Sequence, residues 1–313
     1  MNHRRLSLAI TMVFASLSLR AVAAELVARP PITGISHIAL YVHDLDKTRV
    51  FYKQFLGFEE PYTLADSNGA VHLTFIKIND RQSIELFPEK GTNTDRLNHI
   101  AFETVDAEGL RVYLASQGIK VPDHVPTGRI GNRNFNVIDP DGHQVELVQY
   151  LPDGWTRQAA GKFMPDTRVS IRIRHVGIIV TNLESSLRFY CGVLGFKEIW
   201  RGSRSTNLLS WVNLKVPDGD DYLELMLYTN PPAVDKRGSA HHLSLEVADI
   251  DQARTELLAR TNAVGYTRAM AVQTGINRKR QLNLYDPDGT RVELMESGTV
   301  DGKPAESSRA PFP

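Results

Sequence analysis

Four strand-like runs in this chain begin with a histidine, and each is followed 47 to 51 residues later by a glutamate between two aliphatic residues. The successive pairs are His37 and Glu85, His99 and Glu146, His175 and Glu224, and His242 and Glu293. A polar pair that recurs in register indicates one supersecondary unit repeated four times. The chain is therefore expected to fold as an array of similar, β-rich units.

Each unit combines several β-rich runs with one short helix. In the first unit a strand-like run starts at His37, and Asp44 follows it as a candidate helix N-cap. Apolar residues at helical spacing continue as far as Gly57, which is suited to end a helix. Further β-rich runs cover 71–78 and 83–87. The unit thus has the order β-α-β-β(-β), and the third unit repeats it.

The units alternate in type, which makes the chain a tandem of two pairs. Units two and four both close with the turn Asp-Pro-Asp-Gly, at 139–142 and 286–289. The predicted divisions are a targeting segment at 1–24, a first domain at 34–152, a linker at 153–170, a second domain at 171–297 and a polar, proline-rich tail at 298–313 that is expected to be disordered.

The composition excludes several classes of partner and site. Lys+Arg equals Asp+Glu at 36 each, so nothing in the charge favours nucleic acid or an anionic membrane as partner. The single cysteine, Cys191, excludes an intramolecular disulfide and a thiolate metal cluster. Any metal in this protein should therefore be bound by histidine and carboxylate side chains.

The first residues have the features of a signal peptide. Arg4 and Arg5 precede an apolar stretch from Leu6 to Leu19, and small residues follow at 21–24. The apolar stretch is too short to span a bilayer comfortably, so no stable membrane anchor is expected. We expect cleavage near Ala24 and an exported protein, either periplasmic or secreted.

The repeated glutamates are predicted to face the concave side of a sheet. Side chains alternate between faces along a strand, so aliphatic neighbours that pack against helices leave each glutamate on the opposite face. Carboxylates gathered in a cavity repel one another, and each loses its hydration. A divalent cation bound between them offsets this cost in free energy. Two carboxylates and two neutral imidazoles suit Zn, Ni, Co, Mn or Fe(II). The repeat therefore predicts divalent-metal sites.

The chain resembles the vicinal oxygen chelate superfamily, which includes glyoxalase I, bleomycin-resistance proteins and extradiol dioxygenases. The resemblance covers residues 34–297 and rests on two helix signatures, Phe51-Tyr52…Leu56-Gly57-Phe58 and its copy at 189–196, together with the two Asp-Pro-Asp-Gly turns. It implies an α+β fold of two tandem domains, each a pair of βαβββ modules whose curled mixed sheets surround a metal. The implied metal ligands are His37, Glu85, His99 and Glu146 in the first site, and His175, Glu224, His242 and Glu293 in the second. The modules could also pair crosswise between the domains.

Four ligands per site resemble glyoxalase I, in which a ligand carboxylate moves a proton between adjacent carbons of a small, chelated substrate. By this analogy Glu146 and Glu293 are the expected bases. An extradiol ring-cleavage dioxygenase using Fe(II) is the first alternative, but it carries a tyrosine where this chain has Asn136 and Asn283. An amide cannot act as the acid or base that a tyrosine supplies. A non-catalytic small-molecule binding or resistance protein is the second alternative.

Four further residues are candidates for contact with a small-molecule substrate. Asn136 and Asn283 can donate a hydrogen bond to a bound oxygen, and Arg133 and Arg280 can hold a carboxylate or phosphate. The protein is expected to be a monomer of two domains or a homodimer.

Overall fold

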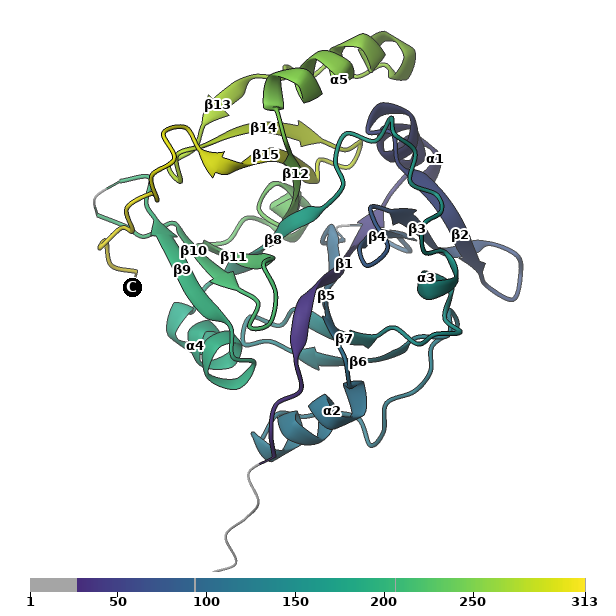
Figure 1. Cartoon of the computed structure of the whole chain (residues 1–313), viewed down its shortest axis with the longest axis vertical. Helices are drawn as coiled ribbons and strands as arrows, with labels where there is room; N and C mark the ends of the chain where they lie inside the picture. The colour runs from purple at the N-terminus through teal and green to yellow at the C-terminus, as the bar shows by residue number, and fades with distance from the viewer. Residues whose placement is uncertain (1–26, 93, 206, 313) are drawn as a thin grey trace, which may run out of the picture.

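The computed structural model describes residues 27–92, 94–205 and 207–312, so the predicted signal peptide lies outside the described residues (Figure 1). Among the described residues no helix is long and apolar enough to cross a membrane. The chain forms two curled mixed sheets of seven and eight strands, as predicted for two tandem domains of βαβββ modules.

The first domain contains the strands β1 (Ile32–Val42), β2 (Glu59–Ala65), β3 (Val71–Lys77), β4 (Ser83–Pro88), β5 (Leu97–Thr104), β6 (Arg133–Ile138) and β7 (Gln144–Gln149). Its helices are α1 (Leu45–Arg49), which continues into the π-helix η1 (Val50–Phe55), and α2 (Ala107–Ser116). A short helix, α3 (Trp155–Gln158), follows in the predicted linker.

The second domain contains the strands β8 (Ile173–Val180), β9 (Lys197–Gly202), β10 (Trp211–Lys215), β11 (Tyr222–Leu227), β12 (His242–Val247), β13 (Val272–Thr274), β14 (Lys279–Tyr285) and β15 (Arg291–Thr299). Its helices are α4 (Leu183–Leu187), which continues into the π-helix η2 (Arg188–Val193), the 3-10 helix η3 (Val234–Ser239) and α5 (Ile250–Val264).

The modules pair within each domain, a question that the sequence left open. In the first sheet the order is β2-β3-β4-β1-β5-β7-β6, and antiparallel pairing of β1 with β5 joins the first module to the second. In the second sheet β8 and β12 make the equivalent antiparallel contact. The four repeated His and Glu residues of each domain therefore lie on four adjacent strands at the centre of one sheet.

The predicted helix boundaries are present in both odd-numbered modules. The side chain of Asp44 accepts a hydrogen bond from the backbone N of Lys47, and Asn182 does the same for Ser185. Gly57, at the end of the first helix, has a φ of 80°, which favours glycine. The helical segment begins with α1 at residue 45, as the predicted N-cap at Asp44 requires.

Helices of the two domains contact each other in two places, and Figure 1 shows α5 of the second domain beside α1 of the first. The rings of Phe55 in η1 and Tyr266, which follows α5, stack with centroids 4.6 Å apart. On the other side the Tyr113 hydroxyl of α2 donates to the backbone O of Val193 in η2 at 2.8 Å. The two domains therefore share one continuous hydrophobic core.

The tail is ordered where disorder was expected, and the predicted linker contacts the first domain. The tail, which was expected to be disordered, runs beside β9, where the backbone N of Ser308 donates to the O of Arg201 at 2.9 Å (Figure 1). The Trp200 indole also donates to the backbone O of Glu306. An edge strand presents unpaired backbone groups, and these groups bind a segment that cannot form a core of its own. In the linker, Trp155 packs against Tyr62 of the first domain.

Candidate metal centres

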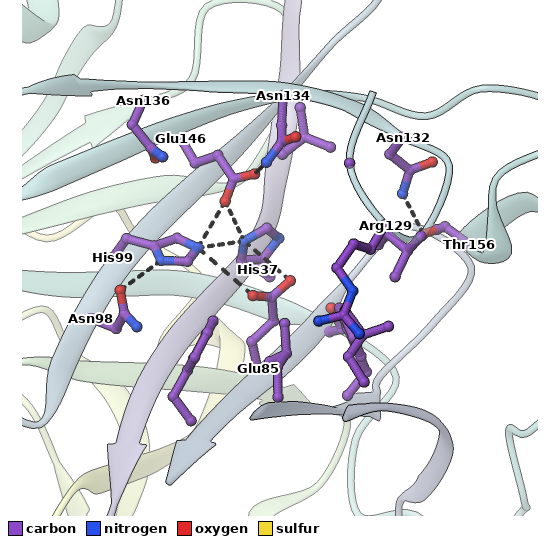
Figure 2. A pocket seen from close by; sticks show the side chains of 18 of the residues that line it. His37, Glu85, Asn98, His99, Arg129, Asn132, Asn134, Asn136, Glu146 and Thr156 are labelled. Atoms are coloured by element: carbon purple, nitrogen blue, oxygen red, sulfur yellow. Dashed lines mark hydrogen bonds and ion pairs between the residues drawn. The ribbon is translucent and has the colours of Figure 1, made fainter. Parts of the chain in front are cut away.

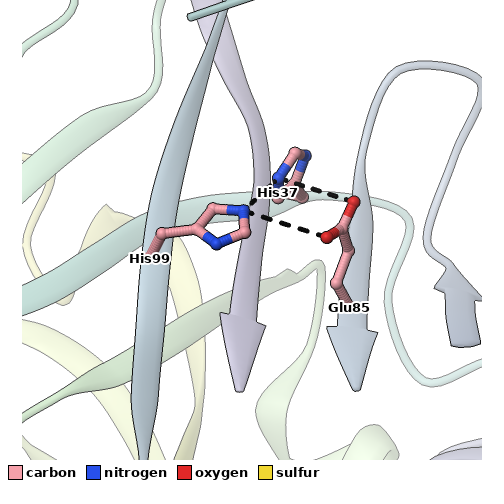
Figure 3. A group of neighbouring side chains, drawn as sticks. All are labelled: His37, Glu85 and His99. Atoms are coloured by element: carbon pink, nitrogen blue, oxygen red, sulfur yellow. Dashed lines mark hydrogen bonds and ion pairs between the residues drawn. The ribbon is translucent and has the colours of Figure 1, made fainter. Parts of the chain in front are cut away.

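The four predicted ligands of the first domain converge on one point. His37 Nε2 lies 2.9 Å from His99 Nε2 and 3.1 Å from Glu146 Oε2, while His99 Nε2 lies 2.8 Å from the same oxygen. Glu85 completes the group, with its Oε1 3.5 Å from His37 Nε2. Figure 2 shows the two carboxylates on opposite sides of the imidazole pair, and Figure 3 isolates His37, Glu85 and His99. All four side chains are buried.

A chain of hydrogen bonds fixes the tautomer of His37. The Tyr150 hydroxyl donates its proton to the backbone O of Arg81 at 2.7 Å, so the same hydroxyl accepts from Ser36 Oγ at 2.5 Å. Ser36 therefore accepts from His37 Nδ1, which lies 2.9 Å away and carries the proton. The lone pair of His37 is then on Nε2, where it points at the other three side chains.

Two more imidazoles have the same orientation. His99 Nδ1 donates to Asn98 Oδ1 at 3.0 Å, and His242 Nδ1 donates to the backbone O of Ala240 at 2.8 Å. Both acceptors are oxygens without a proton, so the Nε2 atom of each ring is free to act as an acceptor or a metal ligand.

The second domain repeats the arrangement. His175 Nε2 lies 3.1 Å from His242 Nε2 and 3.3 Å from Glu293 Oε2, and His242 Nε2 lies 3.4 Å from Glu224 Oε2. The ring of His175 is held by stacking on Tyr222, with centroids 4.6 Å apart. The adjacent His241 points elsewhere, because its Nδ1 pairs with a carboxylate of the first domain.

A glycine makes room for one imidazole of the second site. Gly177 on β8 lies opposite His242 on β12, and a Cβ built on Gly177 would stand 1.9 Å from His242 Cε1. In the first domain Ala39 lies opposite His99 in the same register. The imidazole of His242 therefore lies across its neighbouring strand in a space that only glycine leaves open.

The carboxylates on the last strand of each domain are held in their charged form. Burial would raise the pKa of Glu146, but His37 and His99, when a proton on Nε2 makes them donors, outweigh it and keep the pKa below its ordinary value. Burial is likewise outweighed at Glu293, where hydrogen bonding and the charge of His175 lower the pKa to about 2. Each buried carboxylate therefore requires a positive partner at the centre of its site.

The donor set of each site fits a divalent metal. Two ligand nitrogens at about 2.1 Å from one ion and at right angles lie about 3 Å apart, which is close to the observed Nε2 to Nε2 distances. Two imidazoles and two carboxylates give an N2O2 set, suited to Zn, Ni, Co, Mn or Fe(II), and balance the charge of the ion. His37, Glu85 and His99 lie within 4.8 Å of one another through their ligand atoms, and so do His175, Glu224 and His242.

The structure places only two of the four predicted substrate contacts in a cavity. Asn136 and Asn283 line the cavities above the two sites. Arg133 and Arg280 do not, because residues three apart on a strand point to opposite faces. Arg280 instead pairs with Asp251 at 2.7 Å on the side of α5. The prediction that these two arginines contact substrate is therefore not supported.

Different basic residues line the cavities. Arg129 lines the first cavity, and Arg204 and Arg291 line the second. Arg291 stands two residues before Glu293, so strand periodicity alone would have placed both side chains on the same face. Thr156 of the predicted linker also lines the first cavity, which no local sequence signal indicated.

The cavities have the size of small-molecule sites, with volumes of about 330 Å³ in the first domain and 490 Å³ in the second. The first has a partly apolar wall that includes Leu73, Phe75 and Phe87. The second has more polar side chains, with Gln273, Gln281 and Arg291 among them.

Two tandem domains of this fold, each with a buried His-Glu-His-Glu cluster under a small cavity, define a metal-site protein of the glyoxalase type. The family model described as Glyoxalase/Bleomycin resistance protein/Dioxygenase superfamily matches residues 34–147 and 172–294. The chain therefore belongs to this superfamily.

Relatives and solved structures agree with this membership. Uncharacterized protein YaeR of Escherichia coli (strain K12) is 31% identical over 131 residues, which cover 40% of this chain and 95% of YaeR. The Mn(II)-bound glyoxalase from Novosphingobium aromaticivorans has a TM-score of 0.65 at 18% identity, covering 85% of this chain and 83% of its own. The 2,3-dioxygenase LapB from Pseudomonas sp. KL28 has the same TM-score and identity, covering 90% and 99%. At this identity the two structures show the shared fold.

Proposed function

We propose that the protein is an exported, metal-dependent enzyme with glyoxalase I-like lyase or isomerase chemistry on a small substrate that presents two vicinal oxygens. The observation that carries the proposal is the fourth ligand position. In each domain a buried carboxylate on the last strand, Glu146 or Glu293, joins two imidazoles and a second carboxylate. This set leaves two positions of a six-coordinate ion for the two oxygens of a substrate.

The bound divalent cation would supply Lewis acidity, which acidifies the C–H bond next to a coordinated carbonyl. In the first site His37, Glu85, His99 and Glu146 would hold the ion, and Glu146 would also accept the substrate proton and return it to the adjacent carbon. The Asn134 amide donates to Glu146 Oε1, which fixes the orientation of this carboxylate. Glu293 would have the same part in the second site.

A ring-cleavage dioxygenase is the competing function, because the overall likeness to LapB covers most of this chain. The hydroxyl of Tyr150, in the first cavity, is already hydrogen-bonded to Arg81 O and Ser36 Oγ. At the family's tyrosine position each cavity has an amide, Asn136 or Asn283. The side chains that line both cavities therefore favour proton transfer over ring cleavage.

The test uses the protein recovered from the periplasm or medium, whose N-terminus we expect near Glu25. Elemental analysis should find a divalent metal in the wild type. In D₂O, incorporation of deuterium into 2-oxo and 2-hydroxy acids is expected for the wild type and should fall by at least about 100-fold in the double variant E146Q/E293Q, in line with the loss of a general base.

The matched control is N136A/N283A, which leaves every proposed metal ligand in place and should retain bound metal. Oxygen consumption with catechols in the Fe(II)-loaded protein would contradict the proposal in favour of the dioxygenase. Absence of metal from the wild type would contradict metal-dependent chemistry of either kind.

A further inference from the structure

The two cavities differ at a charged position beside their metal centres. Arg291 on β15 lies next to His242 in the parallel register with β12, and its side chain points into the second cavity. At the equivalent register position the first domain has Gln144, next to His99. A cation therefore lies beside the second site, and an uncharged amide lies beside the first.

The buried Nε of the Arg291 guanidinium has no hydrogen-bond acceptor in the described part of the chain. The charge of Arg291 also lowers the pKa of Glu293, a predicted metal ligand, but acts on it through space and not through a hydrogen bond. Basic groups in such surroundings are normally paired with an anion, since burial removes their hydration. The planar donor fork of arginine matches a carboxylate in particular.

Other polar groups around the second site also lack partners. Asn213 Oδ1, Ser244 Oγ and Asn283 Oδ1 are buried and unsatisfied, and the Asn213 and Ser244 side chains are only 5% and 0% exposed. At the register positions equivalent to Asn213 and Ser244 the first domain has Phe75 and Ala101. The second site is thus built for a more polar ligand than the first.

The balance of charge in the second cavity favours an anion. Among the described residues its acidic lining residues are Glu224 and Glu293, which a divalent ion would neutralise, while Arg204 and Arg291 add positive charge. In the first cavity Arg129 is the one arginine among the lining residues that the structure describes, and it is exposed and already donates to a backbone carbonyl. The second cavity therefore has a net positive field where the first has little.

On the basis of the function proposed above, we propose that the second site is specific for a small carboxylate-bearing substrate whose carboxylate pairs with Arg291. The first site then takes a substrate without that group. One chain would thereby combine two related reactions with different substrate specificities, set by one arginine and the polar residues around it.

The experiment compares two chelators in the Zn-loaded full chain by calorimetry. Acetohydroxamic acid presents two vicinal oxygens, and succinic acid monohydroxamate presents the same oxygens with an added carboxylate. In an H99A background, which isolates the second site, R291Q should weaken binding of the carboxylate-bearing chelator by at least about tenfold, the effect of one charge-assisted pair. Affinity for acetohydroxamic acid and zinc content should not change.

The reciprocal variant provides the matched control. In an H242A background, which isolates the first site, Q144R should raise the affinity for succinic acid monohydroxamate and leave that for acetohydroxamic acid unchanged. Equal affinity of R291Q and its parent for the carboxylate-bearing chelator, with zinc bound in both, would overturn this inference alone. Failure of the wild type to bind zinc or either chelator would overturn the proposed function as well.

Discussion

Asp139 and Asp286 occupy equivalent turn positions in the two domains, but their surroundings shift their pKa values in opposite directions. Burial raises the pKa of Asp286 to about 7, and the charge of Asp288 adds to this effect. At Asp139 burial is outweighed by hydrogen bonding and the charge of His143, which hold the pKa below its ordinary value. The residue four positions after Asp286 is Thr290, which brings no charge to offset burial.

This difference predicts how stability depends on pH. The folded protein binds the proton of Asp286 more tightly than the unfolded chain, whose pKa is about 3.8. The resulting stabilisation is fully present below about pH 4 and is lost as pH rises to about 7. D286N should therefore gain stability relative to the wild type between these values, by up to about 4 kcal/mol at 1.4 kcal/mol per pKa unit. Urea denaturation followed by tryptophan fluorescence at several pH values measures it.

D139N is the matched control, and its effect should have the opposite sign. The lowered pKa of Asp139 means that its stabilisation is present above its ordinary pKa and lost as pH falls, so D139N should be less stable than the wild type at neutral pH and approach it in acid. Parallel pH profiles for D286N and the wild type would show that Asp286 is already charged in the folded state.

At the scale of the elements, the second metal centre depends on a glycine of β8, because the imidazole of His242 lies across this strand. G177A would place a methyl carbon 1.9 Å from Cε1 of His242, so the ring must turn away from the other three predicted ligands. We expect the variant to lose about half of the bound metal, all of it from the second site, with little change in folding. Elemental analysis with one site at a time removed by H99A or H242A measures the loss.

The first domain supplies the control for this prediction. Ala39 already tolerates a methyl group opposite His99, so A39G should keep metal in both sites. Full metal occupancy in G177A would show that the His242 ring can move without leaving the site.

Strand periodicity explains both the successes and the failure of sequence-based prediction here. The repeat placed His37, Glu85 and their equivalents on one face because each glutamate is flanked by aliphatic residues that pack on the other. The same rule, had it been applied to Arg133 and Arg280, would have excluded them from the cavities. The pairing of modules could not be predicted, because both arrangements present the same strand edges. Nor could the ordered tail, whose partner β9 lies about a hundred residues away.

At the scale of the whole molecule, buried side chains of each domain contact side chains of the other. The Tyr190 hydroxyl of the second domain donates to Asp139 of the first at 2.8 Å, and Tyr52 of the first faces Asp286 of the second at 3.5 Å. With the helix pairs described above, these contacts bury side chains that would otherwise be exposed in either domain alone.

This shared core predicts that neither domain is stable alone. Pieces ending at Asp166 and starting at Thr167 should each aggregate or self-associate when expressed separately, since the ring of Phe55 and the facing Tyr266 would be exposed. Co-expression should restore a one-to-one complex that binds metal at both sites. Size-exclusion chromatography with light scattering and circular dichroism measure the outcome. A folded, monomeric piece would contradict the prediction.

The predicted metal centres and the contacts between the domains differ in which domain supplies their residues. The predicted ligands of each metal centre come from a single domain, whereas the buried contacts between the domains draw residues from both. A duplicated unit in this arrangement is free to change the lining of one cavity, as Gln144 and Arg291 differ, without disturbing the other cavity. Loss of one whole domain is expected to unfold the other domain, which depends on the contacts between them. The contacts between the domains would thus keep both domains in the chain while the linings of the two cavities differ.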